Sequence, residues 1–206
     1  LEIMLDDSAQ AIKGITQSLH CIEKIVTLSV KALNSNGRIL YVGAGTSGRL
    51  GVLDASECNP TFGVSPDTVK GIIAGGNDAL IKSIEGAEDN TDSVADLVKE
   101  NSIKKNDIVI GISCSGGAPF VLEFLKQSKL QLSTTALLTF NDIDDIDYVD
   151  SIVRVIVGPE IITGSTRMKG GTATKIILNM ITTATMIKLN KTYGNYMVDL
   201  RVMNKK

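Results

Sequence analysis

The fold can be inferred from residues 38–57, which read RILYVGAGTSGRLGVLDASE. An apolar run from Arg38 to Gly43 passes through a glycine-rich turn into a helical pattern from Ser47 to Glu57. A buried strand that enters a helix through glycines is typical of the first half of a β-α-β unit. We therefore predict a strand and a helix here, joined by a loop at which a ligand can bind.

The same alternation continues along the chain, because short β-branched runs alternate with helical stretches. The predicted strands are 38–43, 69–74, 107–113, 135–140 and 152–157. The predicted helices are 47–57, 79–86, 91–101, 118–128 and 165–189, preceded by one opening helix from Asp6 to Leu33. Strands that are apolar on both faces indicate a parallel sheet covered on both sides. We predict an α/β fold, a three-layer sandwich with about five parallel strands, in one domain (1–206) with a helical lead-in (1–36) and an α/β core (37–206).

Composition excludes several function classes. The 206 residues carry 21 Lys and Arg against 23 Asp and Glu, so no basic surface for nucleic acid or an anionic membrane is expected. No apolar stretch reaches the length of a membrane span, and we expect a cytoplasmic protein. Cys21, Cys58 and Cys114 are widely spaced and His20 is the single histidine, so neither disulfides nor a metal site is expected.

The first loop, Gly43 to Gly48, matches G-x-G-x-x-G, the dinucleotide fingerprint. The acidic residue that would hold a ribose is missing, because the second strand ends in Ile73-Ala74-Gly75-Gly76-Asn77. Glycine amides and two hydroxyls at a helix N-terminus instead suit a small phosphate monoester. The alternative is a glycine turn that permits tight helix packing. The candidate binding residues are Gly45, Thr46, Ser47 and Gly48.

The second loop, Ser113-Cys114-Ser115-Gly116-Gly117, follows the third strand and has the same composition. Ser113, Ser115 and Gly116 could bind an oxyanion, or they could form a turn and a helix cap. Cys114 could be a nucleophile, but without a histidine in a comparable loop an inert small residue is the better interpretation.

The third loop, residues 163–172, places two cations among hydroxyls and glycines. Ser165, Arg167 and Lys169 are candidates for substrate binding, and the entry of the long helix explains the same composition equally well.

Carboxylates are the remaining candidates for proton transfer, because His20 in the opening helix is best explained as a surface or packing residue. Glu57 ends the helix after the first loop, and Glu85 and Glu88 lie in Ile84-Glu85-Gly86-Ala87-Glu88. From their chemistry alone, acids at helix ends are more often solvated or capping than catalytic.

Several longer motifs resemble the N-acetylmuramic acid 6-phosphate etherases, members of the sugar isomerase (SIS) domain superfamily with a flavodoxin-like sheet. They are GAGTSGRLGVLDASECNPTFGV (43–64), IAGG (73–76), IEGAEDN (84–90), TGSTRMKGGTATKIILNM (163–180) and YGNYMVD (193–199). The resemblance implies cleavage of the D-lactyl ether of N-acetylmuramic acid 6-phosphate in peptidoglycan recycling, without a metal or nucleotide cofactor. It also implies a homodimer with active sites near the subunit contact. The family has a further C-terminal helical region, which we expect to be absent from this chain.

By motif match, the resemblance makes Glu57 (in DASE) and Glu88 (in EGAE) the catalytic acids. The elimination needs removal of the C2 proton and protonation of the departing lactyl oxygen, after which water adds at C3. We assign Glu57 to the ether oxygen and the incoming water, and Glu88 to the C2 proton. The 6-phosphate is expected chiefly on Ser47 and Ser115.

The second loop departs from the family's SGRTP, since this chain has Ser115-Gly116-Gly117-Ala118-Pro119. An arginine and a threonine that could contact phosphate are thereby absent. Two other functions stay open at this point. One is a non-catalytic phosphosugar sensor related to the glucokinase regulatory protein, and the other is an aldose-ketose isomerase.

Overall fold

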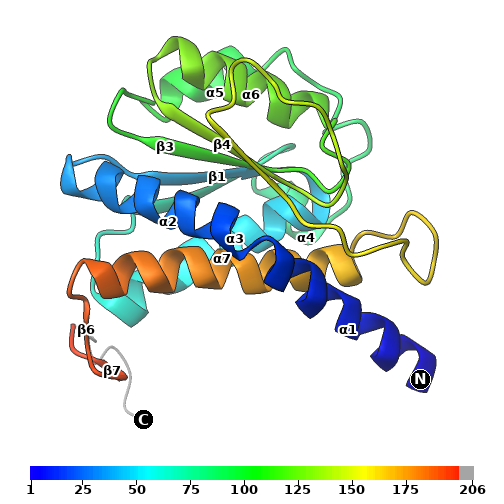
Figure 1. The fold of residues 1–206 in the computed structure, drawn as a ribbon. Helices are drawn as coiled ribbons and strands as arrows, with labels where there is room; N and C mark the ends of the chain where they lie inside the picture. The colour runs from blue at the N-terminus through cyan, green and yellow to red at the C-terminus, as the bar shows by residue number, and fades with distance from the viewer. Residues whose placement is uncertain (200–206) are drawn as a thin grey trace.

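The computed structural model describes residues 1–199 and shows one parallel sheet between two layers of helices (Figure 1). The five strands pair in the order β2-β1-β3-β4-β5, all parallel. Their bounds are β1 Ile39–Gly43, β2 Val69–Ile73, β3 Ile108–Ile112, β4 Thr134–Thr139 and β5 Ser151–Arg154. The predicted α/β class and all five strands are confirmed, although β5 ends three residues earlier than expected.

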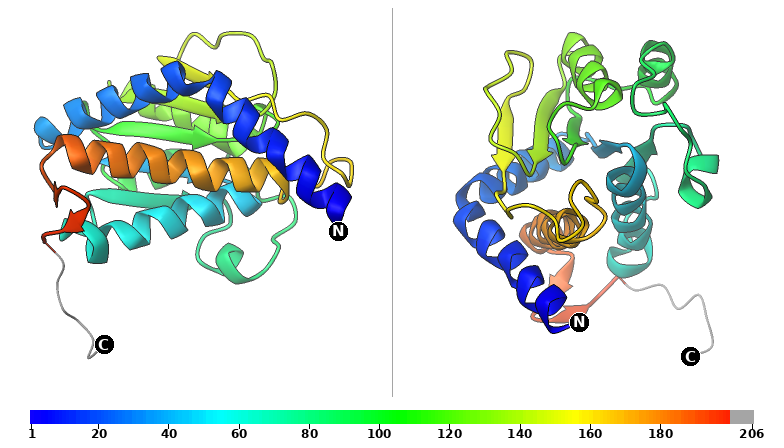
Figure 2. Two further views of the ribbon diagram at one scale, coloured as in Figure 1. Left: turned by 60° about the horizontal axis from the view of Figure 1, so that its bottom comes forward. Right: turned by 90° about the vertical axis from the view of Figure 1, so that its right-hand side faces the viewer.

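The helices form two layers around the sheet. One face is covered by α5 and α6, and the other by α2, α3 and α7. In the end-on view of Figure 2, α7 lies between α1–α2 on one side and α3 on the other. The bounds are α1 Glu2–Gln17, α2 Leu19–Asn34, α3 Gly45–Phe62, α4 Asp78–Ile81, α5 Val94–Glu100, α6 Pro119–Leu130 and α7 Lys169–Lys188. No helix among residues 1–199 is long and apolar enough to cross a membrane.

The strands form the middle layer because their side chains are buried on both faces. The four residues Ile39 to Val42 of β1 are completely inaccessible to solvent. The strand side chains that face α2, α3 and α7 belong to one apolar cluster, and the strand side chains that face α5 and α6 belong to another. The strand order reverses between β1 and β3, and ligands of such sheets bind at the carboxyl ends of the strands that flank this point.

The opening helix predicted from Asp6 to Leu33 is instead two helices that meet at Ser18. The Ser18 hydroxyl lies 3.1 Å from the carbonyl oxygen of Gly14 and 2.8 Å from that of Arg154, at the end of β5. A Cβ on Gly14 would come within 2.7 Å of the Ile156 carbonyl oxygen. The chain changes direction here because it contacts the β5 segment, which periodicity cannot reveal.

Three smaller differences concern chain segments without strong periodicity. The helix predicted at 79–86 is only the single turn α4, and the following residues form turns. The long helix begins at Lys169 rather than Ser165. A short hairpin of β6 (Thr192–Tyr193) and β7 (Tyr196–Met197) follows α7 and was not predicted.

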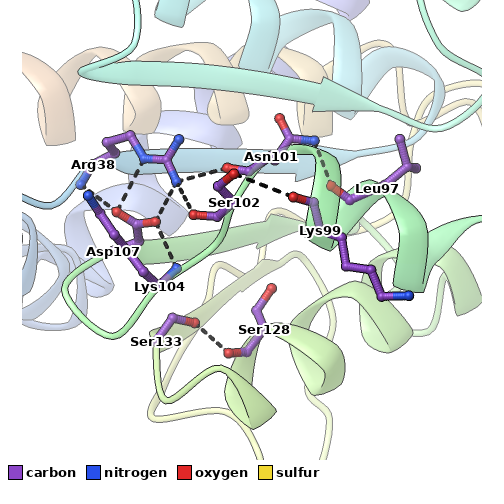
Figure 3. Close-up of polar contacts among 9 residues, drawn as sticks. All are labelled: Arg38, Leu97, Lys99, Asn101, Ser102, Lys104, Asp107, Ser128 and Ser133. Atoms are coloured by element: carbon purple, nitrogen blue, oxygen red, sulfur yellow. Dashed lines mark hydrogen bonds and ion pairs between the residues drawn. The ribbon is translucent and has the colours of Figure 1, made fainter.

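At the amino ends of β1 and β3, Arg38 and Asp107 fix the register of the two strands (Figure 3). The carboxylate of Asp107 is fully buried and accepts hydrogen bonds from the backbone N–H of Arg38 at 3.0 Å and of Lys104 at 3.1 Å. The Arg38 Nη2 atom lies 2.6 Å from Asp107 Oδ2 and also donates to the carbonyl oxygens of Asn101 and Ser102. This cluster lies at the opposite end of the strands from the ligand-binding edge.

Replacing Asp107 with alanine should lower the free energy of unfolding by about 3–5 kcal/mol, because it leaves a mostly buried guanidinium and two backbone donors without an acceptor. Urea denaturation checks this value. The matched control is Asp96→Ala, which removes an exposed ion pair with Lys99 and should cost at most about 1 kcal/mol. Equal losses in the two variants would contradict the proposed role of the Arg38–Asp107 pair.

Candidate active site

A central cavity of about 300 Å³ lies at the carboxyl ends of β1 and β3. It brings together the first loop, the second loop, Glu88 and the third loop, which are distant in sequence. Its lining residues are Ala44, Gly45, Thr46, Ser47, Glu88, Ile112, Ser113, Cys114, Ser115, Ala118, Gly164 and Thr166. Six of the residues predicted from sequence therefore share one cavity: Gly45, Thr46, Ser47, Ser113, Ser115 and Glu88.

The N-terminus of α3 opens into this cavity without a cap. Ala44 precedes the helix and has no side-chain acceptor, and no group among residues 1–199 accepts a hydrogen bond from the N–H groups of Gly45, Thr46 or Ser47. Gly45 has a φ of 52°, which glycine adopts at little cost. Unpaired N–H groups at the positive end of an 18-residue helix attract an anion.

Gly48 acts by packing rather than by facing the cavity. A Cβ on Gly48 would lie 2.7 Å from the Gly43 carbonyl oxygen and 2.6 Å from Ile73 Cγ1, so α3 can approach the sheet this closely only with glycine. Its N–H donates to the Ala44 carbonyl oxygen at 3.2 Å. The packing interpretation of the first loop therefore applies to Gly48, and the binding interpretation stays a prediction for Gly45.

The second loop is ordered by the Ser113 hydroxyl, which accepts hydrogen bonds from the N–H groups of Gly116 at 3.1 Å and Ala118 at 3.3 Å. Gly116 has a φ of 79° and is buried beside Thr139, so it shapes the loop without lining the cavity. Ser115 Oγ accepts from the Gly117 N–H at 3.2 Å and lies 3.4 Å from Ser113 Oγ. Ser113 and Ser115 therefore serve the turn and also present hydroxyl oxygens to the cavity.

The N-terminus of α7 is already occupied by a carboxylate of the chain. Glu160 accepts hydrogen bonds from the N–H groups of Lys169 and Gly170, both at 2.9 Å. The Lys169 ammonium is buried, and it pairs with Asp7 of α1 at 2.7 Å and with the Pro159 carbonyl oxygen at 2.7 Å. Because Lys169 is engaged by protein groups, we leave it out of the proposed substrate site.

The other two third-loop candidates also lie outside the central cavity. Ser165 is half-buried and lines neither the central cavity nor the two cavities next to it. Arg167 lines a separate cavity of about 390 Å³ between α3 and α7, which we name the Arg167 cavity and which shares only Thr46 with the central one.

Glu88 lies in the turn segment that follows α4, and its side chain is exposed. Its carbonyl oxygen accepts the Phe120 N–H at 2.9 Å, which ties the segment to the first turn of α6. Glu88 lines both the central cavity and a neighbouring one of about 260 Å³ that also contains Arg49. It therefore stands where two halves of a ligand would meet.

Glu57 lies elsewhere in the single chain. It is twelve residues after Gly45 on α3, about 18 Å along the helix axis, and its side chain is exposed. It lines neither the central cavity nor the cavity with Arg49. The two predicted acids therefore do not meet within one copy of the chain.

Cys114 lines the central cavity, where burial raises the pKa of its thiol and the nearby carboxylate of Glu160 adds to the rise, against hydrogen bonds from Ser47 and Thr166. A thiol with a raised pKa is a poor nucleophile near neutral pH. This supports its interpretation as a small cavity-lining residue.

A buried polar cluster joins α3 to α7 behind the site. Asp54 Oδ1 accepts a hydrogen bond from Asn179 Nδ2 at 2.6 Å and from Thr182 Oγ1 at 3.3 Å. Burial raises the pKa of Asp54, against those two hydrogen bonds. Burial, with Asp54 nearby, also raises the pKa of Cys58 to about 12 and that of Tyr41 well above its ordinary value. The cluster fixes the helix that carries both the anion-binding turn and Glu57.

Two residues beside the site are not singled out by the sequence analysis, Arg49 and Glu160. A cation such as Arg49 near the N-terminal end of a helix opposes the helix dipole and so indicates a tertiary partner. Glu160 caps a helix that begins nine residues later, and no local pattern signals such a cap. Among residues 1–199, no three His, Cys, Asp or Glu side chains converge as they would around a metal ion.

A parallel sheet of order 2-1-3-4-5 with an uncapped, hydroxyl-lined helix N-terminus at its switch point is an arrangement at which α/β domains commonly bind phosphorylated ligands. The family of the glucokinase regulatory protein N-terminal SIS domain matches residues 20–129. The phosphoheptose isomerase of Francisella tularensis shares the fold, with a TM-score of 0.67 at 18% identity over 89% of this chain and 94% of that one.

Curated relatives identify the branch of this superfamily. The N-acetylmuramic acid 6-phosphate etherase of Clostridium acetobutylicum is 48% identical over 100% of this chain and 68% of its own length. That of Geobacillus thermodenitrificans is 45% identical over 100% of this chain and 70% of its own length. The chain belongs to the N-acetylmuramic acid 6-phosphate etherase family.

Replacing Asp54 with asparagine should change how stability depends on pH. Because burial raises the folded-state pKa of Asp54, the folded chain holds this proton more tightly than the unfolded one. The associated stability is present at low pH and is lost as the pH rises above 3.8, the ordinary value, through the raised pKa. In urea denaturation at a series of pH values, the free energy of unfolding of Asp54→Asn should increase relative to that of the wild type as the pH rises.

The exposed acid Asp96 provides the control for this series, since Asp96→Asn should keep the wild-type pH profile. An Asp54→Asn profile parallel to that of the wild type would contradict the assignment of this linkage to Asp54.

Proposed function

We propose that this protein cleaves the D-lactyl ether of N-acetylmuramic acid 6-phosphate to N-acetylglucosamine 6-phosphate and D-lactate. Membership in the etherase family carries this proposal, and the central cavity supports it. Such a substrate arises in the recycling of cell-wall amino sugars, which belongs to the cytoplasm. The sensor is the less favoured alternative, because the relatives that match the whole chain are etherases and Glu57 and Glu88 are both present.

The 6-phosphate is proposed to lie against the N–H groups of Gly45, Thr46 and Ser47. The hydroxyl groups of Ser47, Ser113 and Ser115 line the same cavity and can donate to phosphate oxygens. The central cavity has no Lys or Arg among its lining residues, so helix dipole and hydrogen bonds supply most of the stabilisation. The occupied N-terminus of α7 leaves α3 as the anion-binding helix of the site.

For the reaction, Glu88 removes the C2 proton while Glu57 protonates the departing lactyl oxygen. Glu57, now a carboxylate, then takes a proton from the water that adds at C3, and Glu88 returns its proton to C2. A single carboxyl can serve as acid and then as base in such a sequence. Glu88 suits the C2 role because it lines the cavity that would hold the sugar. Glu57 can reach the same sugar only if it comes from another copy of the chain.

We therefore infer that the active form is a homodimer in which Glu57 of one subunit completes the cavity of the other. Both acids are exposed in the single chain, so a second subunit would also supply the exclusion of water that this chemistry needs. The surface offers apolar area for such a contact. A groove of about 830 Å³, lined mainly by apolar residues, runs between α2 and α7, and Ile3, Leu5 and Ile12 of α1 are exposed.

Glu57→Gln and Glu88→Gln should each reduce D-lactate release by about 10²-fold or more, the ordinary contribution of an acid–base group. The informative experiment combines them by co-expressing the two variants with different tags and purifying the mixed dimer. One of its two sites then contains both glutamates, so about half of the wild-type activity should return. Each homodimeric variant is the control.

A mixed dimer as inactive as its parents would mean that both acids belong to one subunit or that neither role is correct. Light scattering of the wild type provides the second readout. An active monomer at assay concentration would contradict the shared site.

The Gly117-Ala118 pair leaves the second loop without a cationic side chain, and replacing this pair should strengthen phosphate binding. A Cβ on Gly117 would meet nothing nearer than Ser115 Oγ at 3.9 Å, and Ala118 lines the cavity. Gly117→Arg with Ala118→Thr should lower the Kd for N-acetylglucosamine 6-phosphate about ten-fold. The reason is that the introduced guanidinium can donate a charge-assisted hydrogen bond to the phosphate, where the wild-type side chains donate no hydrogen bond. Isothermal titration calorimetry measures the change.

Gly117→Gln with Ala118→Thr is the matched control, since it adds a side chain of similar reach without a charge. Equal affinity in the two double variants would show that the cavity does not lack a cation.

A further inference from the structure

We propose that Arg49 binds the carboxylate of the D-lactyl group, in the cavity of about 260 Å³ next to the central one. This inference rests on the proposed function, and it assigns the part of the substrate that is released. We name this space the Arg49 cavity; it is lined by Arg49, Glu85 and Glu88 together with the small side chains of Ala74, Ala79 and Ala87.

Arg49 projects from α3 and is only partly satisfied by the protein. Its Nε donates to the Leu80 carbonyl oxygen at 3.3 Å and its Nη2 to the Lys82 carbonyl oxygen at 2.8 Å. Within residues 1–199, no hydrogen bond joins Nη1 to an acceptor and no carboxylate forms an ion pair with the guanidinium. Neutral carbonyl groups hold this half-buried guanidinium in a fixed orientation but do not neutralise its positive charge. Its Nη1 edge therefore stays available to an anion.

The position of this cavity matches the layout of the substrate. The Arg49 cavity and the central cavity share Ala44, Gly45 and Glu88. A sugar whose 6-phosphate lies at the α3 N-terminus can therefore extend past Glu88 into the Arg49 cavity. The scissile bond joins C3 to the lactyl oxygen, so the lactyl group must lie next to the acid that works at C2. Glu88 stands at that boundary.

The chemistry of the two cavities also separates the two anionic groups of the substrate. Backbone N–H groups and hydroxyls at a helix end suit a phosphate, whereas the planar guanidinium fork matches a carboxylate. The alanine side chains leave room for a three-carbon group and its methyl. Arg49 would then distinguish N-acetylmuramic acid 6-phosphate, which carries the lactyl group, from N-acetylglucosamine 6-phosphate, which does not.

The Arg167 cavity is the competing location for the carboxylate, because Arg167 and Lys175 line it. It shares with the central cavity only Thr46 and does not contact Glu88. A lactyl group placed there would be separated from the acid at C2. Arg167 is therefore the matched control for Arg49.

The test compares two substrates on three proteins. One substrate is N-acetylmuramic acid 6-phosphate, and the other is its lactyl carboxamide, which is uncharged at that group. We expect the wild type and Arg167→Met to favour the carboxylate in kcat/KM by about ten-fold or more, and Arg49→Met to lose most of that preference. The inhibition constant of N-acetylglucosamine 6-phosphate, which has no lactyl group, should change less than about three-fold in Arg49→Met.

The outcomes separate this inference from the proposed function. If the wild type releases no D-lactate, the proposed function fails, and this inference fails with it. If the wild type is active but Arg49→Met keeps the preference for carboxylate, only the role of Arg49 is refuted. A loss of N-acetylglucosamine 6-phosphate inhibition as large as the loss of substrate turnover would show that Arg49 only holds the segment from Leu80 to Lys82 in place.

Discussion

The first turn of α3 lies against the carboxyl end of β1 at backbone contact distance, and the whole site depends on this approach. Gly43 and Gly48 face each other there, and a Cβ on either would come within 2.7 Å of the other's backbone. Because the turn is this close, the N–H groups of Gly45 to Ser47 open into the space above the switch point of the sheet. A side chain at Gly43 or Gly48 would move the helix away from the sheet and remove the alignment of its N–H groups with the cavity.

Three helix N-termini reach the same edge of the sheet, yet the chain leaves only one of them unsatisfied among residues 1–199. The first turn of α6 is engaged by Ser113 and by the carbonyl oxygen of Glu88, and that of α7 by the carboxylate of Glu160. In the proposed complex the phosphate therefore has one preferred position, and the rest of the sugar would extend toward Glu88 and Arg49.

The sequence was sufficient where local physics determines the structure. The five strands were predictable because both faces of each are buried, and the first two loops because glycines and hydroxyls follow strands there. It was insufficient where a partner distant in sequence determines the outcome. The break at Ser18 depends on the Arg154 carbonyl oxygen, and the burial of Lys169 depends on Asp7. Motif matching also could not show that Glu88 lines the central cavity and Glu57 does not, because that depends on how the segment after α4 folds over the sheet.

In the proposed dimer α3 serves two sites, because its first turn binds the phosphate of one substrate and its last turns present Glu57 to the other subunit. The side chains between these ends follow one stripe, with Leu50 half-buried and Leu53 49% exposed, which suits a contact with a second copy. The helix is held beside this stripe by Asp54, whose carboxylate accepts hydrogen bonds from Asn179 and Thr182 of α7. A shift of α3 along its axis would therefore move the phosphate-binding turn of one proposed site and the Glu57 carboxyl of the other site at the same time. Asp54 suits this role because hydrogen bonds are directional, so the two bonds from α7 fix the axial position of α3 more narrowly than apolar packing would.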